Sequence, residues 1–412
     1  MTRLRRTPDA SLPDSSADNA PLVPFDPAAF SRRLFLWYRD NARVLPWRNI
    51  DSPYGTWLSE IMLQQTRVAT VIERYGEFLE RFPTIAALAE AQEPEVLALW
   101  SGLGYYRRAR MLHRGAQFVM REFNGKLPRD SRTLRSLPGV GDYTAAAIAS
   151  IAFREQIAVV DGNVERVLFR ILGQPEDRSS AARTRLSRIA QSLVPPPLTP
   201  RARANPPGDH NQAMMELGAT VCTPRAPLCL HCPVVDFCIT RGEHHTVPRD
   251  KQRSRTVAHL LALRKRGTGT EVLLERRPDT ASLMPGMTEL PPLPLEAVAD
   301  REPVLRLRHA ITNTNYYVEL YAESAPGVPP YLDPDNPAIL EEGLVVADPE
   351  DTPHDTYLQQ SIPASEANLF WVATSTLPMQ PLTGLARKAL QRMGVMRIPR
   401  PKIAHRTPTP LA

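Results

Sequence analysis

Cysteine is nearly absent from this 412-residue chain, and the few cysteines stand in one short segment. Thiols scattered at random would not gather in this way, so the segment is a candidate metal site. Thiolates are typical ligands of iron–sulfur clusters and of structural zinc. A pair of disulfides is the alternative, but disulfides persist mainly in oxidising compartments. The spacing is C-x6-C-x2-C-x5-C, formed by Cys222, Cys229, Cys232 and Cys238.

The spacing favours iron over zinc. Structural zinc sites commonly use two short C-x-x-C pairs, and only Cys229 and Cys232 are spaced in that way. The first loop is too long for such a pair and carries Arg225 between two prolines. The expected cofactor is therefore a four-iron, four-sulfur (4Fe-4S) cluster, with zinc as the alternative.

Long apolar runs are also absent. No segment approaches the roughly 20 residues that a membrane-spanning helix needs, and the first residues lack the apolar core of a secretory signal. Residues 1–26 are rich in Pro, Asp and Ser and are expected to form a disordered tail. We therefore expect a cytoplasmic protein with no membrane partner, in a compartment where thiols stay reduced.

Lysine is also scarce: the chain has five lysines, and Lys126 is the only one before residue 251. Arginine supplies the other basic side chains, and the net charge is +6 with a pI of about 9.2. A basic balance favours a polyanionic partner such as nucleic acid, although many basic proteins bind none. The shortage of lysine argues against chemistry that uses a lysine amine as nucleophile.

The apolar pattern changes along the chain and predicts two domains. Up to about Val194, apolar residues recur at the three- and four-residue spacing that is typical of helices, and another helix is expected at Asn211–Thr220. Alternating apolar segments predict strands after Arg241. They are Val257–Leu263, Glu271–Leu274 and Tyr316–Tyr321, followed by a helix near Leu385–Met393.

We therefore expect an all-α domain and a smaller α+β domain. A Pro- and acid-rich segment, residues 324–363, is expected to be a long loop. The expected parts are a tail at 1–26, a helical domain at 27–241 that includes the cysteine loop at 222–238, a linker at 242–256, the second domain at 257–395 and a tail at 396–412.

The segment SRTLRSLPGVGDYTAAAIASIAF, residues 131–153, predicts two helices joined by a tight turn. Gly139 and Gly141 would let backbone N–H groups approach a phosphate, and the helix that begins at Asp142 would point its positive end toward it. Such contacts hold DNA without reading its sequence. An ordinary turn between helices is the alternative, but Val160-Asp161-Gly162-Asn163 downstream favours a helix-hairpin-helix motif.

Hairpin, downstream aspartate and cysteine loop together resemble the endonuclease III superfamily of DNA glycosylases. Within residues 27–240, the segments WLSEIMLQQTRVATVI, GLGYYRRAR, LPGVGDYTAAAI, DGNVERV and NQAMMELGA resemble the adenine DNA glycosylases of the MutY family. The resemblance implies a helix-hairpin-helix glycosylase domain with an iron–sulfur cluster loop, plus a C-terminal α+β Nudix-like domain. It also implies a monomeric enzyme of base excision repair, associated with the nucleoid, which removes adenine mispaired with 8-oxoguanine or guanine from double-stranded DNA.

Cleavage of an N-glycosidic bond requires a proton for the departing base and negative charge near the sugar cation. One carboxyl group must therefore be protonated while another is ionised. Glu60 shares a helix face with Trp57 and Ile61, and partial burial there would raise its pKa. A lone glutamate on a helix is more often solvated, but the resemblance implies that Glu60 protonates adenine.

Asp161 fits the second role, although an aspartate just before a helix also suits a simple N-cap. The resemblance implies that Asp161 stabilises, or transiently bonds to, the sugar cation, and that Asn163 orients it or the attacking water. Tyr143 stands where bifunctional relatives carry a lysine that forms a Schiff base. Tyr143 and the shortage of lysine together predict a monofunctional glycosylase.

The resemblance also implies DNA contacts. Gln65 and Tyr105 match residues that wedge into the duplex while adenine is flipped out; ordinary packing is their alternative role. The cysteine loop would have a structural and DNA-docking role, with Arg225 at a phosphate. Contacts with the flipped base are implied for Trp47, Arg48 and Gln212.

VLLERRPDTASLMPGMTELP resembles the entry to the family's Nudix-like domain. The run of metal-binding glutamates of a catalytic Nudix motif is missing, so we expect no pyrophosphatase activity. In the family a Phe-Ser-His loop contacts 8-oxoguanine; here Ile311 precedes Thr312 and Asn313. Thr312 and Asn313 are expected to make this contact with altered hydrogen bonding, and a plain β-turn is the alternative.

Two other functions stay open at this point. One is a related glycosylase for another lesion, with or without lyase activity, and Tyr143 counts against it. The other is an inert DNA-binding scaffold, for which the presence of both Glu60 and Asp161 is unexpected.

Overall fold

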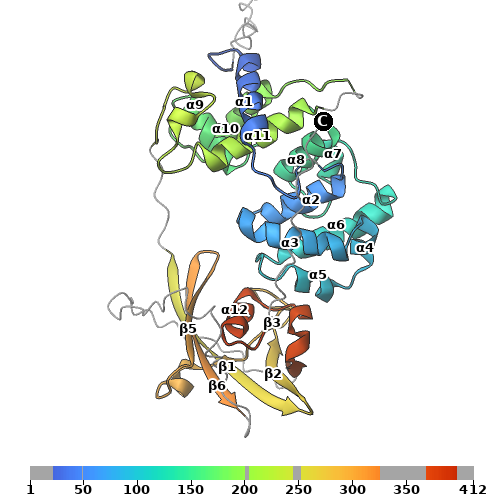
Figure 1. Ribbon diagram of the computed structural model, residues 1–412, viewed down its shortest axis with the longest axis vertical. Coiled ribbons are helices and arrows are strands. Elements are labelled where there is room, and N and C mark those ends of the chain that lie inside the picture. The colour runs from blue at the N-terminus through green and yellow to red at the C-terminus, as the bar shows by residue number, and fades with distance from the viewer. Residues whose placement is uncertain (1–21, 49, 200–203, 245–251, 325–367, 397–412) are drawn as a thin grey trace, which may run out of the picture. The chain divides into compact units, whose positions relative to one another are not determined.

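Helices fill the first part of the chain and a sheet the last part (Figure 1). The computed structural model describes residues 22–48, 50–199, 204–244, 252–324 and 368–396. The chain divides into two compact units, each built from two separate stretches of sequence. The first unit comprises Met1–Arg43 and Ala145–Val247, and the second comprises Val44–Thr144 and Pro248–Ala412.

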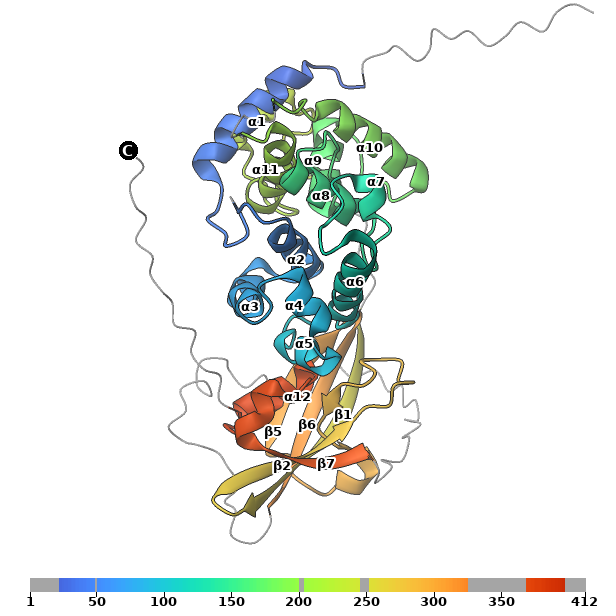
Figure 2. The same ribbon diagram turned by 90° about the vertical axis from the view of Figure 1, so that its right-hand side faces the viewer.

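The first unit is a group of helices around one apolar core. Helix α9 shows why they fold in this way, because its buried residues Val164, Val167, Leu168 and Ile171 recur every three or four positions. Side chains of the other helices close the same core, including Phe30, Leu34, Leu186 and Leu217. The helices are α1 (Pro27–Asn41), α9 (Gly162–Ile171), α10 (Ser180–Leu193) and α11 (Pro206–Thr220) (Figure 2).

The prediction of a disordered tail over residues 1–26 is wrong for its last residues. Val23 is buried, and the ring of Phe25 stacks on that of Phe30 with 5.4 Å between centroids. Asp26 caps α1 by accepting hydrogen bonds from the amides of Ala28 and Ala29. Apolar side chains within the polar segment account for this difference, because they add to the core of the first unit. Residues 1–21 lie outside the described part.

The second unit begins with the helices that carry most of the predicted site. Helix α2 is buried around its whole circumference, since every residue from Tyr54 to Met62 is buried, including the polar residues Thr56, Ser59 and Glu60. Phe78 and Trp100 pack edge to face beside it, with ring centroids 5.9 Å apart. The helices are α2 (Pro53–Leu63), α3 (Val68–Arg81), α4 (Ile85–Glu90), α5 (Glu93–Leu99), α6 (Arg107–Phe123) and α7 (Ser131–Leu134), and α8 (Asp142–Phe153) begins here and continues into the first unit.

The sheet also belongs to the second unit. Its strand order is β3-β2-β1-β6-β5, with β4 paired to β1 and β7 paired to β2. β1 and β6 run parallel, and the other pairs are antiparallel. The strands are β1 (Arg253–Arg266), β2 (Gly269–Arg276), β3 (Thr288–Glu289), β4 (Pro292–Leu293), β5 (Leu305–Ile311), β6 (Thr314–Ser324) and β7 (Leu369–Ala373).

The three predicted strands are confirmed as parts of β1, β2 and β6, and the predicted C-terminal helix is α12 (Gly384–Arg392). Helix α12 lies over the sheet and buries Leu385, Ala389 and Leu390 in its core (Figure 2). β1 begins inside the segment expected to be a linker, since 253–256 already pair with β6. The expected long loop lies outside the described residues, except for the residue that ends β6.

Among the described helices, none has the length and apolar character needed to cross a lipid bilayer.

Candidate active site

Glu60 and Tyr143 meet inside the second unit. Glu60 lies on the buried helix α2 and is only 6% exposed. Tyr143 lies in the first turn of α8, and its hydroxyl donates a hydrogen bond to Oε2 of Glu60 at 2.8 Å. Both residues were predicted, but their contact was not, because the sequence separates them by more than eighty positions. The contact brings the side chains of α2 and α8 together at a buried carboxyl group.

A second hydrogen bond joins the same two helices. The side-chain nitrogen of Gln64 donates to Oγ1 of Thr144 at 3.1 Å. Thr144 is buried and directly follows Tyr143. The end of α2 and the start of α8 are thus held at two adjacent points, which fixes the position of the Glu60 carboxyl group.

Asp161 has a different environment in the first unit. It is the N-cap of α9, and its Oδ1 accepts a hydrogen bond from the backbone N–H of Val164 at 2.8 Å. Its Oδ2 accepts another from the Asn163 side chain at 2.9 Å. The predicted pair of Asp161 and Asn163 is therefore in contact, and the N-cap role is real as well. N–H donors and a helix N-terminus both stabilise negative charge.

Hydrogen bonds continue from Asn163 to the cysteine loop through Arg166, which was not predicted. One terminal nitrogen of Arg166 donates to Oδ1 of Asn163 at 2.9 Å and to the carbonyl of Gly218 at 2.7 Å. Its Nε donates to the carbonyl of Cys222 at 2.9 Å. Only the structure shows that the arginine of the DGNVERV segment joins the Asp161 site to the loop.

Arg170, one turn further along α9, organises the start of the cysteine loop and was also missed. It is 1% exposed, so its guanidinium must be paired within the protein. It donates to the carbonyl of Thr223 at 2.7 Å and to that of Pro224 at 2.9 Å. It also donates to Sγ of Cys222 at 3.3 Å, which places a positive charge beside a candidate thiolate ligand.

The four cysteines are partly buried free thiols on one loop. Burial, with smaller contributions from charge on the other three cysteines, raises the pKa of the Cys232 thiol to about 11. Within the described ranges, no group of three or more His, Cys, Asp or Glu side chains is arranged to hold a metal ion. The donor set nevertheless fits a thiolate-bound group, since N–H donors already face Cys222 and Cys238.

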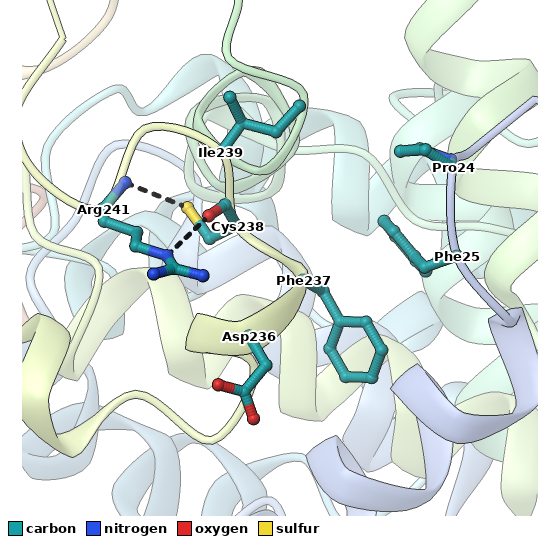
Figure 3. A pocket seen from close by; sticks show the side chains of 7 residues that line it. All are labelled: Pro24, Phe25, Asp236, Phe237, Cys238, Ile239 and Arg241. Atoms are coloured by element: carbon teal, nitrogen blue, oxygen red, sulfur yellow. Dashed lines mark hydrogen bonds between the residues drawn. The ribbon is translucent and has the colours of Figure 1, made fainter.

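A pocket lies beside the end of this loop (Figure 3). The rings of Phe25 and Phe237 line it with 5.1 Å between centroids. The Arg241 backbone N–H donates to Sγ of Cys238 at 3.4 Å, and its Nε donates to the Cys238 carbonyl at 3.2 Å. Arg225, predicted to meet a phosphate, is exposed elsewhere on the loop.

The two predicted wedge residues are exposed in the second unit. Gln65 follows α2 and has a φ of 56°, and Tyr105 precedes α6 and has a φ of 46°. Both values lie in the left-handed region, which residues other than glycine rarely adopt. Tyr105 is 43% exposed, unlike the other tyrosine in the same segment, Tyr106, which is buried. Their exposure is compatible with contact with a large ligand.

Arg108 holds the backbone beside both wedge residues and was not predicted. It lies in the first turns of α6, and burial lowers the pKa of its guanidinium to about 10. The guanidinium lies at the C-terminal end of α2, where the last carbonyls lack partners within the helix. The helix dipole also favours a cation at that end. At 2.8–3.1 Å Arg108 donates to the carbonyls of Ile61, Met62, Leu103 and Gly104 and to the hydroxyl of Thr66.

The predicted hairpin turn lies between α7 and α8. Gly139 has a φ of +79°, and a Cβ added there would lie 2.5 Å from Cβ of Met111, so only glycine fits. A Cβ at Gly141 would meet nothing within 4 Å, which leaves the backbone there open to a ligand. Arg135 and Asp142 form an ion pair at 2.7 Å across the turn.

The remaining predicted residues are spread over both units. Trp47 is buried against Tyr75 of α3, with ring centroids 5.5 Å apart. Arg48 beside it is half-buried, as is Gln212 on α11 of the first unit. Thr312 and Asn313 form the exposed two-residue turn of the β5–β6 hairpin, in register with the pair Ile311 and Thr314. The structure thus shows a turn at this position, and the contact with 8-oxoguanine stays a prediction.

Comparison with known proteins shows what part of the chain resembles. Residues 58–196 match the family model described as HhH-GPD superfamily base excision DNA repair protein. This range includes Glu60, the hairpin turn and Asp161. This part of the chain is therefore similar to the HhH-GPD superfamily.

The curated relatives of this chain carry a more specific name. The adenine DNA glycosylase of Rattus norvegicus is 52% identical over 223 residues, which are 52% of this chain and 42% of that protein. The human adenine DNA glycosylase is 50% identical over 223 residues, or 52% of this chain and 39% of that protein. That of Arabidopsis thaliana is 38% identical over 309 residues, or 64% and 47%. The resemblance to the MutY family is confirmed, while the chain spans less than half the length of these three relatives.

Among solved structures, a thermostable thymine-DNA glycosylase aligns at 28% identity over 52% of this chain and 96% of that chain. The TM-score of this alignment is 0.47.

Proposed function

We propose that this protein is a monofunctional DNA glycosylase that hydrolyses the N-glycosidic bond of adenine mispaired with 8-oxoguanine or guanine. The observation that carries the proposal is the buried Glu60 carboxyl group, which the Tyr143 hydroxyl holds at 2.8 Å. Such a site keeps a proton available for a departing base. The adenine specificity rests on the names of the relatives, which are 52% and 50% identical over 223 residues.

In the proposed reaction Glu60 protonates adenine as the glycosidic bond breaks. Asp161 stabilises the sugar cation, or bonds to it transiently, with Asn163 fixing the orientation of the carboxylate or of the attacking water. Tyr143 takes the place of a Schiff-base lysine, so the product is an abasic site in an intact strand.

Double-stranded DNA is the proposed partner. Gly139 and Gly141 would present backbone N–H groups to a phosphate. Gln65 and Tyr105 would wedge into the duplex and stabilise the flipped-out adenine. Arg225 would meet another phosphate. The flipped base would be contacted by Trp47, Arg48 and Gln212.

A 4Fe-4S cluster is the proposed cofactor of the cysteine loop, with zinc as the alternative. Cys222, Cys229, Cys232 and Cys238 would hold it, and when bound it would supply a rigid, docked loop rather than redox chemistry. The contact between Arg170 and Cys222 supports this proposal, since N–H donors to sulfur stabilise thiolate charge. Brown colour and visible absorbance of the protein purified without air would support iron, and a colourless preparation would count against it.

The C-terminal sheet is proposed to be a Nudix-like recognition domain without pyrophosphatase activity. Thr312 and Asn313 at the exposed β5–β6 turn are its proposed contacts with 8-oxoguanine. The nucleoid-associated, monomeric state expected from the sequence stays a prediction.

An alkali test separates the proposed function from its alternatives. A duplex with adenine opposite 8-oxoguanine is incubated with the protein, and half of the sample is then treated with alkali. Strand scission only after alkali is the expected result, because alkali breaks a DNA strand at an abasic site. Scission without alkali would indicate a lyase, and no scission in either half would indicate a scaffold.

A further inference from the structure

The segment that carries Tyr105 is held from the C-terminal part of the second unit. The hydroxyls of Ser101 and Tyr106 donate hydrogen bonds to the same acceptor, the backbone carbonyl of Leu382, at 3.1 and 2.8 Å. Ser101 and Tyr106 lie on either side of Tyr105 in the segment 101–106, here called the wedge loop. One carbonyl between the sheet and α12 therefore fixes both ends of this loop.

The position of Leu382 is itself well defined. Leu382 forms an isolated parallel bridge with Thr288 of β3. The Thr288 backbone N–H donates to the carbonyl of Pro381 at 2.9 Å, and that of Thr383 donates back to the Thr288 carbonyl at 2.9 Å. Thr383 is also the N-cap of α12. The acceptor thus belongs to a rigid segment fixed by a strand on one side and a helix on the other.

Arg387 of α12 adds a third hydrogen bond to the wedge loop. Its Nε donates to Oγ of Ser101 at 2.6 Å. Ser101 and Tyr106 are 0% and 3% exposed, and Arg387 is 7% exposed. Buried polar groups are costly when unpaired, so these three side chains resist separation from their partners.

The wedge loop needs such support because its backbone is strained. Gly102 and Gly104 have φ values of 97° and 68°, and Tyr105 between them and α6 has a φ of 46° although it is not glycine. Residues held in this region persist only where their surroundings fix them. On the helical side Arg108 donates to the carbonyls of Leu103 and Gly104 at 2.9 and 3.1 Å. The loop is therefore clamped from two directions.

We propose that the C-terminal domain positions the wedge loop through the Leu382 carbonyl and the Arg387 guanidinium, and so sets how well Tyr105 enters DNA. Ser101, Tyr106 and Arg387 are positioning residues, since none of them is placed at the reacting atoms. The inference rests on the proposed function only for the role of Tyr105 in DNA. It gives the C-terminal domain a second task, which is to hold part of the adenine-excising domain in its working conformation.

The test compares two tyrosine variants of the full chain. Tyr106→Phe removes the hydroxyl that donates to Leu382 and leaves the ring. Tyr54→Phe is the matched control, because its buried hydroxyl donates to the carbonyl of Phe82 at 3.0 Å in the same unit and does not touch the wedge loop. Hydrogen exchange of the backbone amides of residues 101–106 is measured without DNA, and single-turnover adenine excision is measured with an adenine·8-oxoguanine duplex.

Tyr106→Phe should speed exchange in the wedge loop and slow excision by about fivefold each, the worth of one buried hydrogen bond. Tyr54→Phe should leave both unchanged. Arg387→Met should act in the same direction as Tyr106→Phe, while Arg301→Met, at an exposed ion pair with Glu323, should not.

Equal exchange in the wedge loop of the Tyr106→Phe and Tyr54→Phe proteins would overturn the proposal, whatever the activity. Faster exchange with unchanged excision would also overturn it, because the loop would then not control the wedge. If the wild type excises no adenine, the proposed function fails by itself, and the exchange comparison still decides whether the C-terminal domain holds the loop.

Discussion

Two carboxyl groups of this molecule have opposite surroundings. Glu60 lies within a helix that is buried on all faces, and a tyrosine hydroxyl contacts its carboxyl group. Asp161 lies half-buried at a helix N-terminus, where a backbone amide and an asparagine side chain donate to it. Burial disfavours a charged carboxylate, whereas N–H donors at a helix N-terminus favour one.

The two helices give their carboxyl groups different contacts: Glu60 lies inside the buried helix α2, and Asp161 is the N-cap of α9. The proposed reaction needs a protonated carboxyl group together with an ionised one. We propose that Glu60 supplies the first and Asp161 the second. Predictions that alter one site and spare the other test whether this division of roles is real.

The largest effect is expected at Glu60. Glu60→Gln keeps the shape and hydrogen-bonding capacity of the side chain but removes the transferable proton, so single-turnover adenine excision should fall about a thousandfold. Glu80→Gln, on the exposed face of α3, is the matched control and should keep the wild-type rate. A Glu60→Gln protein that stays fully active would remove Glu60 from the acid role.

The two units should also differ in their sensitivity to acid, because the first unit, which contains Asp161, has a buried histidine. Burial lowers the pKa of His210 to about 4, while Ser31 lies 3.2 Å from its Nδ1. The unfolded chain, with a histidine pKa of about 6.5, binds more protons than the folded chain between these values. The contribution of the neutral His210 side chain to the unfolding free energy is therefore fully present above about pH 6.5 and is lost as the pH falls toward 4.

The expected loss is about 3 kcal/mol of unfolding free energy. Urea unfolding at pH 7.5 and 4.5 should show it in the wild type, and His210→Gln should reduce the difference. His231→Gln, at an exposed residue of the cysteine loop, should not. An unchanged pH dependence in His210→Gln would show that other groups cause the acid sensitivity.

Tyr143→Phe tests whether the Tyr143 hydroxyl positions the proposed acid, Glu60. Loss of the hydroxyl at 2.8 Å should slow excision about tenfold, because the Glu60 carboxyl group would no longer be held in place. The product should still need alkali for strand scission. A rate equal to that of the wild type would show that burial alone prepares Glu60.

Asn163→Ala tests the support of the anion and should have the smallest effect. Asp161 keeps the hydrogen bond from the Val164 amide at 2.8 Å, so excision should slow only about fivefold. Asn41→Ala, which removes an exposed side-chain bond to the Trp37 carbonyl in the same unit, is the control. A loss as large as that of Glu60→Gln would mean that Asn163 itself takes part in the chemistry.

Local sequence patterns predicted much of this fold, namely the features that depend on residues close to one another in the chain. Helical spacing, the glycine of the hairpin turn and the alternating strands are written in neighbouring residues. β5 was not predicted, although its first four residues, 305–308, alternate apolar and charged side chains as a half-buried strand does. This alternation is short, and the pairing of β5 with β6 follows only from the folded hairpin. The packing of Val23 and Phe25 was missed because their composition is that of a tail.

The candidate site divides in the same way. Glu60, Asp161 and Tyr143 stand in motifs, so they could be proposed from the sequence, and their roles stay predictions. Arg108, Arg166 and Arg170 bind carbonyl groups that are distant in sequence. A chain rich in arginine gives no local signal that Arg170 is buried and that Arg108 and Arg166 are half-buried. Contacts between segments far apart, such as that of Ser101 with Leu382, follow only from the folded chain.

The proposed division of roles, with Glu60 as the acid and Asp161 as the anion, can be tested with a nucleobase that needs no proton to leave. A duplex carrying a cationic 7-methyladenine opposite 8-oxoguanine is given to the wild type, Glu60→Gln and Asp161→Asn, and single-turnover release of the base is measured against release of ordinary adenine. The account predicts that Glu60→Gln recovers to within about tenfold of the wild type on the cationic base, while Asp161→Asn stays slow on both. Equal impairment of Glu60→Gln on both bases would contradict it.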